Sequence, residues 1–356
     1  MKNIVYSLIK TFFGLEENSS REIGTPKKIL VIRQHNQLGD LLACVSIFRA
    51  IKEKYPSAEV SVIVSPANKN ALHKNKFIDE LFVFDKNKIF SISYLKKIIN
   101  FLKNDYDVAI VPVTVSISFT SNLLCRIAKA NIRIGPGSLN GKVNDSAFLF
   151  DRRINLDWRK YPDANVSDFS LDILRPFKIT TENFSSEISY DEKDELEAKA
   201  FLDSFNRKDG KIIGLHVGAG KPPNRWSYEN FISLINLLEA DYQPIIYLTG
   251  SSDDIELINV ILSGIIPETK LFLNKEIPEV AALIARSDLF VTNDTGIMHV
   301  AGTTSTPQIS IFGPTNPFNW APIGKQKHFL RNSDLIDDVT VDEVFSLCKK
   351  LLADEK

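Results

Sequence analysis

Three glycine-containing loops carry the side chains that could do chemistry in this sequence. In the first loop, Gly39 allows a tight turn and Asp40 follows it, shortly after an apolar run that ends at Arg33. Asp40 stands where a helix should begin, so it is either a general base or an N-cap, and capping would keep its carboxylate ionised. Arg33 is then a contact to an anion or a surface charge.

The second loop, HVGAGKPPNRW, has the composition of an anion-binding site. Gly218, Ala219 and Gly220 leave backbone amides accessible, and Lys221 and Arg225 flank them. The loop lacks the GxxxxGK[ST] spacing of a P-loop. No GxGxxG motif follows the first strand expected in either half of the chain, which argues against a Rossmann dehydrogenase.

The third loop lies within VTNDTGIMHVAG. Asp294, Thr295 and Gly296 stand where a strand should end and a helix should open, and His299 follows Thr295 by one helical turn. Thr295 and the free amides could hold a phosphate, while Asp294 could orient a sugar or cap the helix. His299 is either part of that site or an ordinary structural histidine.

Alternating apolar runs and amphipathic segments must position these loops. The apolar runs predict strands at 27–33, 58–64, 80–84, 107–113, 211–218, 243–250, 270–273, 288–294 and 308–313. The segments between and after them predict helices at 40–54, 91–104, 228–239, 253–262, 278–286 and 341–352. This alternation predicts an α/β protein with doubly wound parallel sheets, which bind ligands at the carboxyl ends of their strands.

The same pattern divides the chain into four segments. We expect an amphipathic helix and linker at 1–26, an α/β domain at 27–185, a second at 186–338, and a C-terminal helix at 339–356 that packs back on the first domain. The first helix places Ile4, Val5, Leu8, Ile9, Phe12 and Phe13 on one face. That face could lie on a membrane surface or pack on the protein.

Composition narrows the class of protein. The 356 residues are 44% hydrophobic and 24% charged with a net charge of −1, which excludes a disordered chain. Residues 1–185 hold 27 Lys and Arg against 18 Asp and Glu, a net charge of +9 that indicates an anionic partner or a solvated surface.

Three cysteines without a CxxC pair fit a reducing compartment. No apolar run reaches the ~18 residues of a membrane span, so we expect a soluble or peripheral protein.

These motifs resemble those of glycosyltransferase family 9, the ADP-heptose:lipopolysaccharide heptosyltransferases. The resemblance rests on RQHNQLGDLL, LHVGAGKPPNRW, YLTGSSDD and VTNDTGIMHVAG followed by SIFGPTNP, and it covers about residues 27–330. Each piece alone is weak, but the four occur in the family's order at the expected ligand-facing loops.

The resemblance implies a GT-B fold, in which two Rossmann-like domains face each other across a cleft. It implies inverting transfer of a sugar, heptose or a relative of it, from ADP-heptose to a lipopolysaccharide-type or other envelope glycan, without a metal or further cofactor. Asp40 would be the general base, with Arg33 and Gly39 on the acceptor side. The residues matching the family's donor site are Gly218, Ala219, Gly220, Lys221, Arg225, Asp254, Asp294, Thr295, Gly296 and His299. The protein would be cytoplasmic, in peripheral contact with the anionic inner face of the cytoplasmic membrane, and would not bind nucleic acid.

Of three differences from the family pattern, those at Asn224 and in the first loop keep alternatives open, whereas Asp254 keeps the carboxylate. Asn224 stands where relatives commonly carry Lys, and Asp254 where they usually carry a glutamate that contacts the ribose. The loop from Arg33 to Asp40 is one residue longer than in many members. The alternatives are a transferase that uses another hexose donor and a non-catalytic nucleotide-sugar-binding protein of envelope polysaccharide assembly.

Overall fold

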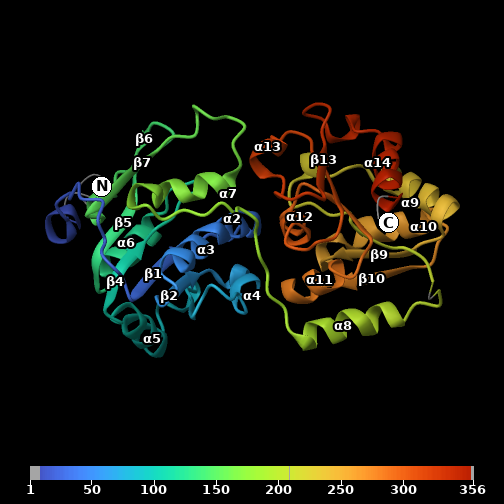
Figure 1. Ribbon diagram of the computed structural model, residues 1–356. Coiled ribbons are helices and arrows are strands. Elements are labelled where there is room, and N and C mark those ends of the chain that lie inside the picture. The colour runs from blue at the N-terminus through green and yellow to red at the C-terminus, as the bar shows by residue number, and fades with distance from the viewer. Residues whose placement is uncertain (1–8, 208, 354–356) are drawn as a thin grey trace. The chain divides into compact units, whose positions relative to one another are not determined.

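The computed structural model describes residues 9–207 and 209–353. The chain forms two compact units, and the boundary between them in the sequence lies between Phe184 and Ser185. This division lies next to the boundary expected at 185/186. Figure 1 shows each unit with its strands at the centre and helices around them. We describe each unit by itself.

The first unit is built on one mostly parallel sheet. Its strands are β1 (Lys28–Arg33), β2 (Glu59–Val64), β3 (Glu80–Val83), β4 (Tyr106–Ile110), β5 (Ala130–Leu139), β6 (Lys142–Val143) and β7 (Arg152–Leu156). They are ordered β3-β2-β1-β4-β5-β6, with β7 paired to β5 and only the β5–β6 pair antiparallel. The interior strands are apolar on both faces because helices cover them, as parallel sheets require.

Helices connect these strands in the alternation that the sequence predicts. They are α2 (Leu38–Ala43), α3 (Val45–Lys54), α4 (Lys69–Leu72), α5 (Ile92–Leu102), α6 (Phe119–Ile127) and α7 (Val166–Phe169). The helix expected at 40–54 begins earlier and is interrupted at Cys44, so α2 and α3 are separate. The expected strands at 27–33, 58–64, 80–84 and 107–113 correspond to β1, β2, β3 and β4.

The second unit repeats this plan with an entirely parallel sheet. Its strands are β8 (Ile212–His216), β9 (Ile245–Gly250), β10 (Thr269–Leu273), β11 (Leu289–Asn293), β12 (Gln308–Ile311) and β13 (Lys327–Leu330), in the order β10-β9-β8-β11-β12-β13. Its helices are α8 (Glu192–Asp203), α9 (Tyr228–Tyr242), α10 (Ile255–Gly264), α11 (Ile277–Ile284), α12 (Gly296–Ala301), α13 (Pro317–Trp320) and α14 (Val341–Ala353). Two doubly wound α/β units are therefore present, as predicted.

The C-terminal helix corrects one expectation. We expected 339–356 to pack back on the first domain, but the apolar face of α14 is buried in the core of the second unit. Val344, Cys348 and Leu351 belong to that core, and α14 lies against α9. The apolar stripe of α14 is therefore buried within its own unit.

The N-terminal segment is described only from residue 9. Residues 9–13 are helical, while Ile4, Val5 and Leu8 of the predicted amphipathic face lie outside the described residues. The backbone N–H of Leu15 donates to Phe148 O and that of Asn18 to Asp151 O, so the chain after the helix is fastened to the first unit. None of the described helices is both long enough and apolar enough to span a bilayer.

Candidate functional site

Both sheets reverse their strand order at one place, and the predicted site residues gather there. In the first unit the reversal lies between β1 and β4, and in the second between β8 and β11. At such a switch point the two adjacent loops leave in opposite directions and open a crevice at the carboxyl ends of the strands. The three loops singled out from the sequence follow β1, β8 and β11.

In the first unit, Asp40 is paired with Arg33. Arg33 is the last residue of β1, and its Nη2 lies 3.6 Å from Asp40 Oδ2. The same nitrogen donates hydrogen bonds to Asp40 O at 3.3 Å and to Thr114 Oγ1, beyond β4, at 2.6 Å. Arg33 is 1% exposed and Asp40 3%. Arg33 is therefore not a surface charge, and its guanidinium stabilises the negative charge of Asp40.

The local geometry corrects two sequence interpretations of this loop. The N-cap of α2 is Gln37, and Asp40 is the third helical residue, so the capping interpretation of Asp40 is wrong. Gly39 is helical too and does not have a positive φ, so it makes no tight left-handed turn.

The second unit contains a pocket at the carboxyl ends of its strands. Of the predicted donor residues, five line it: Ala219, Gly220, Arg225, Asp254 and Thr295. The remaining lining residues were not predicted: His216, Thr249, Gly250, Ser251, Asp253, Asn274, Lys275, Ile277, Val280 and Ile297. The pocket thus combines two cations, two carboxylates, hydroxyl groups and a few apolar side chains.

Gly218 lies behind this pocket, against Asp254. A Cβ at position 218 would lie 2.3 Å from Asp254 Oδ1, closer than any side chain could approach. Asp254 is itself fixed, because its Oδ2 accepts hydrogen bonds from the Ser251 backbone N–H and hydroxyl, both at 2.9 Å. Glycine at 218 therefore lets the loop after β8 pack directly on the carboxylate that faces the pocket.

The loop from β8 to α9 is anchored at its far end by Trp226. This side chain is fully buried, and its Nε1 donates to Val339 O at 2.8 Å. Its backbone N–H donates to Asn293 Oδ1, and Asn293 Nδ2 donates in turn to Val217 O, so the ends of β8 and β11 are tied together. Arg225, which precedes Trp226, donates from Nη2 to Ala219 O at 2.9 Å. This hydrogen bond joins the two sides of the loop beside the pocket.

Asn224 faces Asp294 beside this loop. Asn224 Nδ2 donates to Asp294 Oδ2 at 2.7 Å. Burial raises the pKa of Asp294, while a hydrogen bond from Thr315 and the charge of Lys221 act in the opposite direction. Neither Asp294 nor Lys221 lines the pocket. Thr295 does, and it is the N-cap of α12 although its side chain makes no capping bond.

His299 and His216 are both buried and uncharged near neutral pH. Burial lowers the pKa of each to about 4. His216 ends β8, lines the pocket, and places Nδ1 3.0 Å from Thr249 Oγ1. His299 packs edge-on against Trp320 and, like Gly296, is not among the residues that line the pocket. His216, which the sequence analysis did not single out, is thus the histidine that lines this pocket.

The missed lining residues carry weak sequence signals. Thr249 and Gly250 end a predicted strand, and Asn274 and Lys275 follow another, so their position at the carboxyl edge was available from the pattern. Ile277 and Val280 belong to α11, where apolar residues read as core. Among the described residues, no group of three or more His, Cys, Asp or Glu side chains could hold a metal ion.

Residues 95–345 match the family model described as glycosyltransferase family 9 (heptosyltransferase). This match spans well over half of the chain. The chain belongs to glycosyltransferase family 9.

Similar proteins agree with this membership over nearly the whole length. Lipopolysaccharide heptosyltransferase 3 of Escherichia coli is 23% identical over 346 residues, which cover 89% of this chain and 96% of that protein. The solved family 9 glycosyltransferase of Veillonella parvula has a TM-score of 0.81 at 20% identity, covering 96% of this chain and 100% of the other. The E. coli ADP-heptose lipopolysaccharide heptosyltransferase II structure has a TM-score of 0.75 at 22% identity, covering 92% and 99%.

This family 9 glycosyltransferase therefore has the GT-B fold predicted from the sequence. The family match begins within the first unit and extends through the second, where it includes every loop that lines the pocket. The first-unit loop with Arg33 and Asp40 lies before the matched range, and its resemblance to the family rests on the RQHNQLGDLL motif.

Proposed function

We propose that this glycosyltransferase moves heptose or a related sugar from ADP-heptose to a lipopolysaccharide-type or other envelope glycan, with inversion and without a metal. The observation that carries the proposal is the second-unit pocket, where a glycine loop, Arg225 and Asp254 surround one hollow. The names of the relatives support the sugar and the acceptor. A further E. coli heptosyltransferase, 17% identical with a TM-score of 0.67, is solved with ADP-2-deoxy-2-fluoro heptose.

The chemistry of the lining residues fits a nucleoside diphosphate. Arg225 supplies a fixed planar cation for a phosphate, and Lys275, which is ion-paired with Glu197, lines the same pocket. The Thr295 hydroxyl, which is not used for capping, can donate to a phosphate oxygen. Asp254 can accept hydrogen bonds from ribose hydroxyls, and Ile277 with Val280 gives the base an apolar wall.

The transfer step needs a base on the acceptor and charge stabilisation on the leaving group. An acceptor hydroxyl oxygen forms a bond to the anomeric carbon while the bond from that carbon to the diphosphate oxygen breaks. The proton of the hydroxyl goes to Asp40, and the electron pair of the broken bond goes to ADP. Attack from the side opposite the leaving group inverts the anomeric configuration.

Arg33 suits Asp40 to this role by holding it in one place. Its guanidinium contacts both the carboxylate and the backbone carbonyl of Asp40, and Thr114 fixes the guanidinium from the neighbouring loop. A base held in one rotamer loses less entropy when the acceptor arrives. Arg33 is thus a positioning residue and Asp40 the catalytic one.

Metal independence follows in this proposal from the cations around the donor pocket. Arg225, Lys275 and the nearby Lys221 supply positive charge where the diphosphate leaves. We therefore expect turnover to be unchanged by excess EDTA. Loss of activity that Mg²⁺ or Mn²⁺ restores would overturn this part of the proposal.

A lipid-linked acceptor places the enzyme at a membrane. We propose a cytoplasmic protein in peripheral contact with the inner face of the cytoplasmic membrane, with the first unit receiving the acceptor. The net charge of +9 in residues 1–185 supports this assignment, because phosphorylated core saccharides and anionic lipids are both negative.

Incubation of the purified protein with ADP-heptose and a heptose-deficient lipopolysaccharide core tests the proposal directly. We expect ADP release and an acceptor heavier by one heptose. In Asp40→Asn, the turnover rate should fall about 10²- to 10⁴-fold, as for loss of a general base, while ADP binding stays within about twofold. Undiminished transfer by that variant would reject Asp40 as the base.

The alternatives have distinct outcomes in the same assay. The change to Asn224 and the longer Arg33–Asp40 loop favour a different hexose donor or a non-catalytic binder. Transfer only from another nucleotide sugar would establish the first alternative. Tight binding of ADP-heptose without transfer to any envelope acceptor would establish the second.

A further inference from the structure

The segment from Lys86 to Lys103 exposes more apolar surface than its fold requires. Five large apolar side chains within eleven residues are exposed: Ile89 36%, Phe90 90%, Ile92 73%, Leu95 38% and Ile99 43%. They lie on the loop after β3 and along α5 (Figure 1). Exposed apolar side chains that cluster in this way mark an interaction surface.

The inner face of α5 already accounts for how the helix is held. Ile98, Phe101 and Leu102 are buried in the core of the first unit. At the start of the helix, the Tyr94 hydroxyl donates to Val83 O at 2.9 Å and accepts from the Asp85 N–H at 2.7 Å. The stripe of Ile92, Leu95 and Ile99, spaced by three and four residues, therefore contributes little to the fold.

Lysines surround this apolar stripe, and no acidic residue interrupts it. The segment contains Lys86, Lys88, Lys96, Lys97 and Lys103 and no Asp or Glu. Asp85, just before it, is paired with Lys88 at 3.3 Å. The surface thus combines exposed Ile, Leu and Phe side chains with a strong excess of positive charge.

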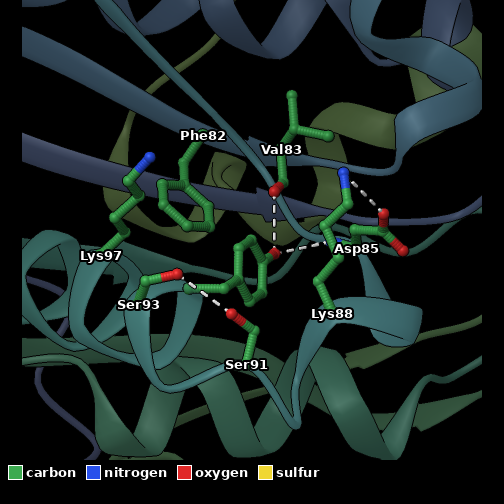
Figure 2. Close-up of a pocket in the computed structure, with 8 residues that line it drawn as sticks. Phe82, Val83, Asp85, Lys88, Ser91, Ser93 and Lys97 are labelled. Atoms are coloured by element: carbon green, nitrogen blue, oxygen red, sulfur yellow. Dashed lines mark hydrogen bonds and ion pairs between the residues drawn. The ribbon is translucent and has the colours of Figure 1, made fainter.

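A polar hollow lies beside the stripe. Figure 2 shows Lys88 and Lys97 on opposite sides of it, with Ser91 and Ser93 along one edge. The Ser91 and Ser93 hydroxyls are hydrogen-bonded to each other at 3.0 Å. Two ammonium groups and two hydroxyls give a phosphodiester headgroup several donors, while Asp85 keeps Lys88 oriented.

We infer that this surface, Lys86–Lys103 with its hollow, docks the first unit on a bilayer containing anionic phospholipid. Isolated lysines are depleted at the centres of protein interfaces, whereas apolar side chains ringed by lysines are typical of helices that lie in a membrane interface. Each lysine gains attraction to anionic lipid, and Phe90 and Ile92 gain burial among the acyl chains. The inference gives the membrane contact proposed above a defined surface, and vesicle binding tests it without any sugar transfer.

Flotation of the full-length protein with vesicles measures this docking. We expect it to float with mixed phosphatidylcholine and phosphatidylglycerol vesicles but not with phosphatidylcholine alone. The double variants Phe90→Ser/Ile92→Ser and Lys96→Glu/Lys97→Glu should each weaken partitioning about tenfold or more. Because all four side chains are exposed, the melting temperature of both variants should match that of the wild type.

Matched variants in the second unit provide the controls. Ile266→Ser/Leu335→Ser removes two side chains that are 78% and 69% exposed, and Lys349→Glu/Lys350→Glu reverses the exposed lysine pair of α14. Both should bind anionic vesicles like the wild type. The proposal fails if the wild type does not bind anionic vesicles or if the α5 variants bind them as well as the wild type does. It also fails if the control variants lose as much vesicle binding as the α5 variants. Self-association that only Phe90→Ser/Ile92→Ser abolishes, without vesicle binding, would assign the surface to a second copy.

The same variants separate docking from catalysis. With a detergent-solubilised acceptor, all four should transfer sugar at the wild-type rate if the proposed function holds. Failure of transfer in the wild type would count against the proposed function and leave the docking measurement intact.

Discussion

Asn224 donates a hydrogen bond of 2.7 Å from Nδ2 to Oδ2 of Asp294, joining the loop after β8 to the loop after β11. The donor in this contact is a neutral amide. Burial raises the pKa of Asp294 even though Thr315 and the charge of Lys221 act in the opposite direction. The ionised carboxylate is therefore held at a cost to stability.

Replacement of Asp294 by Asn should remove that cost. A carboxyl whose pKa is raised by folding binds its proton more tightly in the native state. It therefore lowers the free energy of unfolding as the pH rises above the pKa that the carboxyl has in the unfolded state. We expect Asp294→Asn to unfold with a higher free energy than the wild type at pH 7. The difference should vanish near pH 3, where both states are protonated. Urea unfolding across this range measures it, and a variant less stable than wild type at pH 7 would contradict the expectation.

Gly218→Ala should weaken donor binding. The new Cβ would meet Asp254 Oδ1 at 2.3 Å, so either the carboxylate or the glycine loop must move away from the pocket. We expect about a tenfold or greater loss of ADP affinity by calorimetry, since the contact shifts two elements of the site together.

Gly220→Ala is the matched control for that change. Gly220 lines the same pocket two residues further along, but a Cβ there meets no atom within 4 Å. ADP affinity should change by less than about threefold. Equal losses in the two variants would show that loop flexibility, and not the contact with Asp254, governs binding.

The sequence predicted the fold well where strands are buried on both faces. β1, β2, β8, β9, β11 and β12 stand out as apolar β-branched runs because helices cover both sides of the sheet. β5 (ANIRIGPGSL) and the edge strand β13 (KHFL) were not predicted, since β5 contains Gly and Pro and β13 is only half-buried.

The sequence predicted which loops form the candidate site but not which of their side chains line the pocket. The sequence placed Ala219, Arg225 and Thr295 at a strand end, and they line the pocket. It could not show that His299 is buried away from the pocket while His216 lines it, because both stand at or just after the end of an apolar strand. It also could not reveal the pairing of Arg33 with Asp40, because the path of the loop between β1 and α2 sets the distance between them.

Acid should destabilise this protein through its buried histidines. Burial lowers the pKa of His216 and His299 from 6.5 to about 4, so the unfolded state binds more protons between these values. Stability is then fully present above pH 6.5 and is lost as the pH falls toward 4, by roughly 3 kcal/mol for each histidine. His299→Gln should flatten this part of the curve in urea unfolding. An unchanged slope would mean that His299 is protonated in the folded protein.

Removal of the Arg33 guanidinium should destabilise the first unit and slow catalysis together. Arg33 is 1% exposed and is the cation that faces Asp40, so Arg33→Met leaves a buried carboxylate without it. Loss of one partner of a buried ion pair costs about 3 to 5 kcal/mol, whereas Arg33→Lys retains the charge and should recover part of that loss. If Arg33 positions the base, Arg33→Lys should fold and bind ADP normally but transfer sugar about tenfold or more slowly. Lys Nζ ends one bond short of the position of Arg33 Nη2, which contacts both Asp40 and Thr114. Wild-type turnover in Arg33→Lys would show that charge alone is needed at this position.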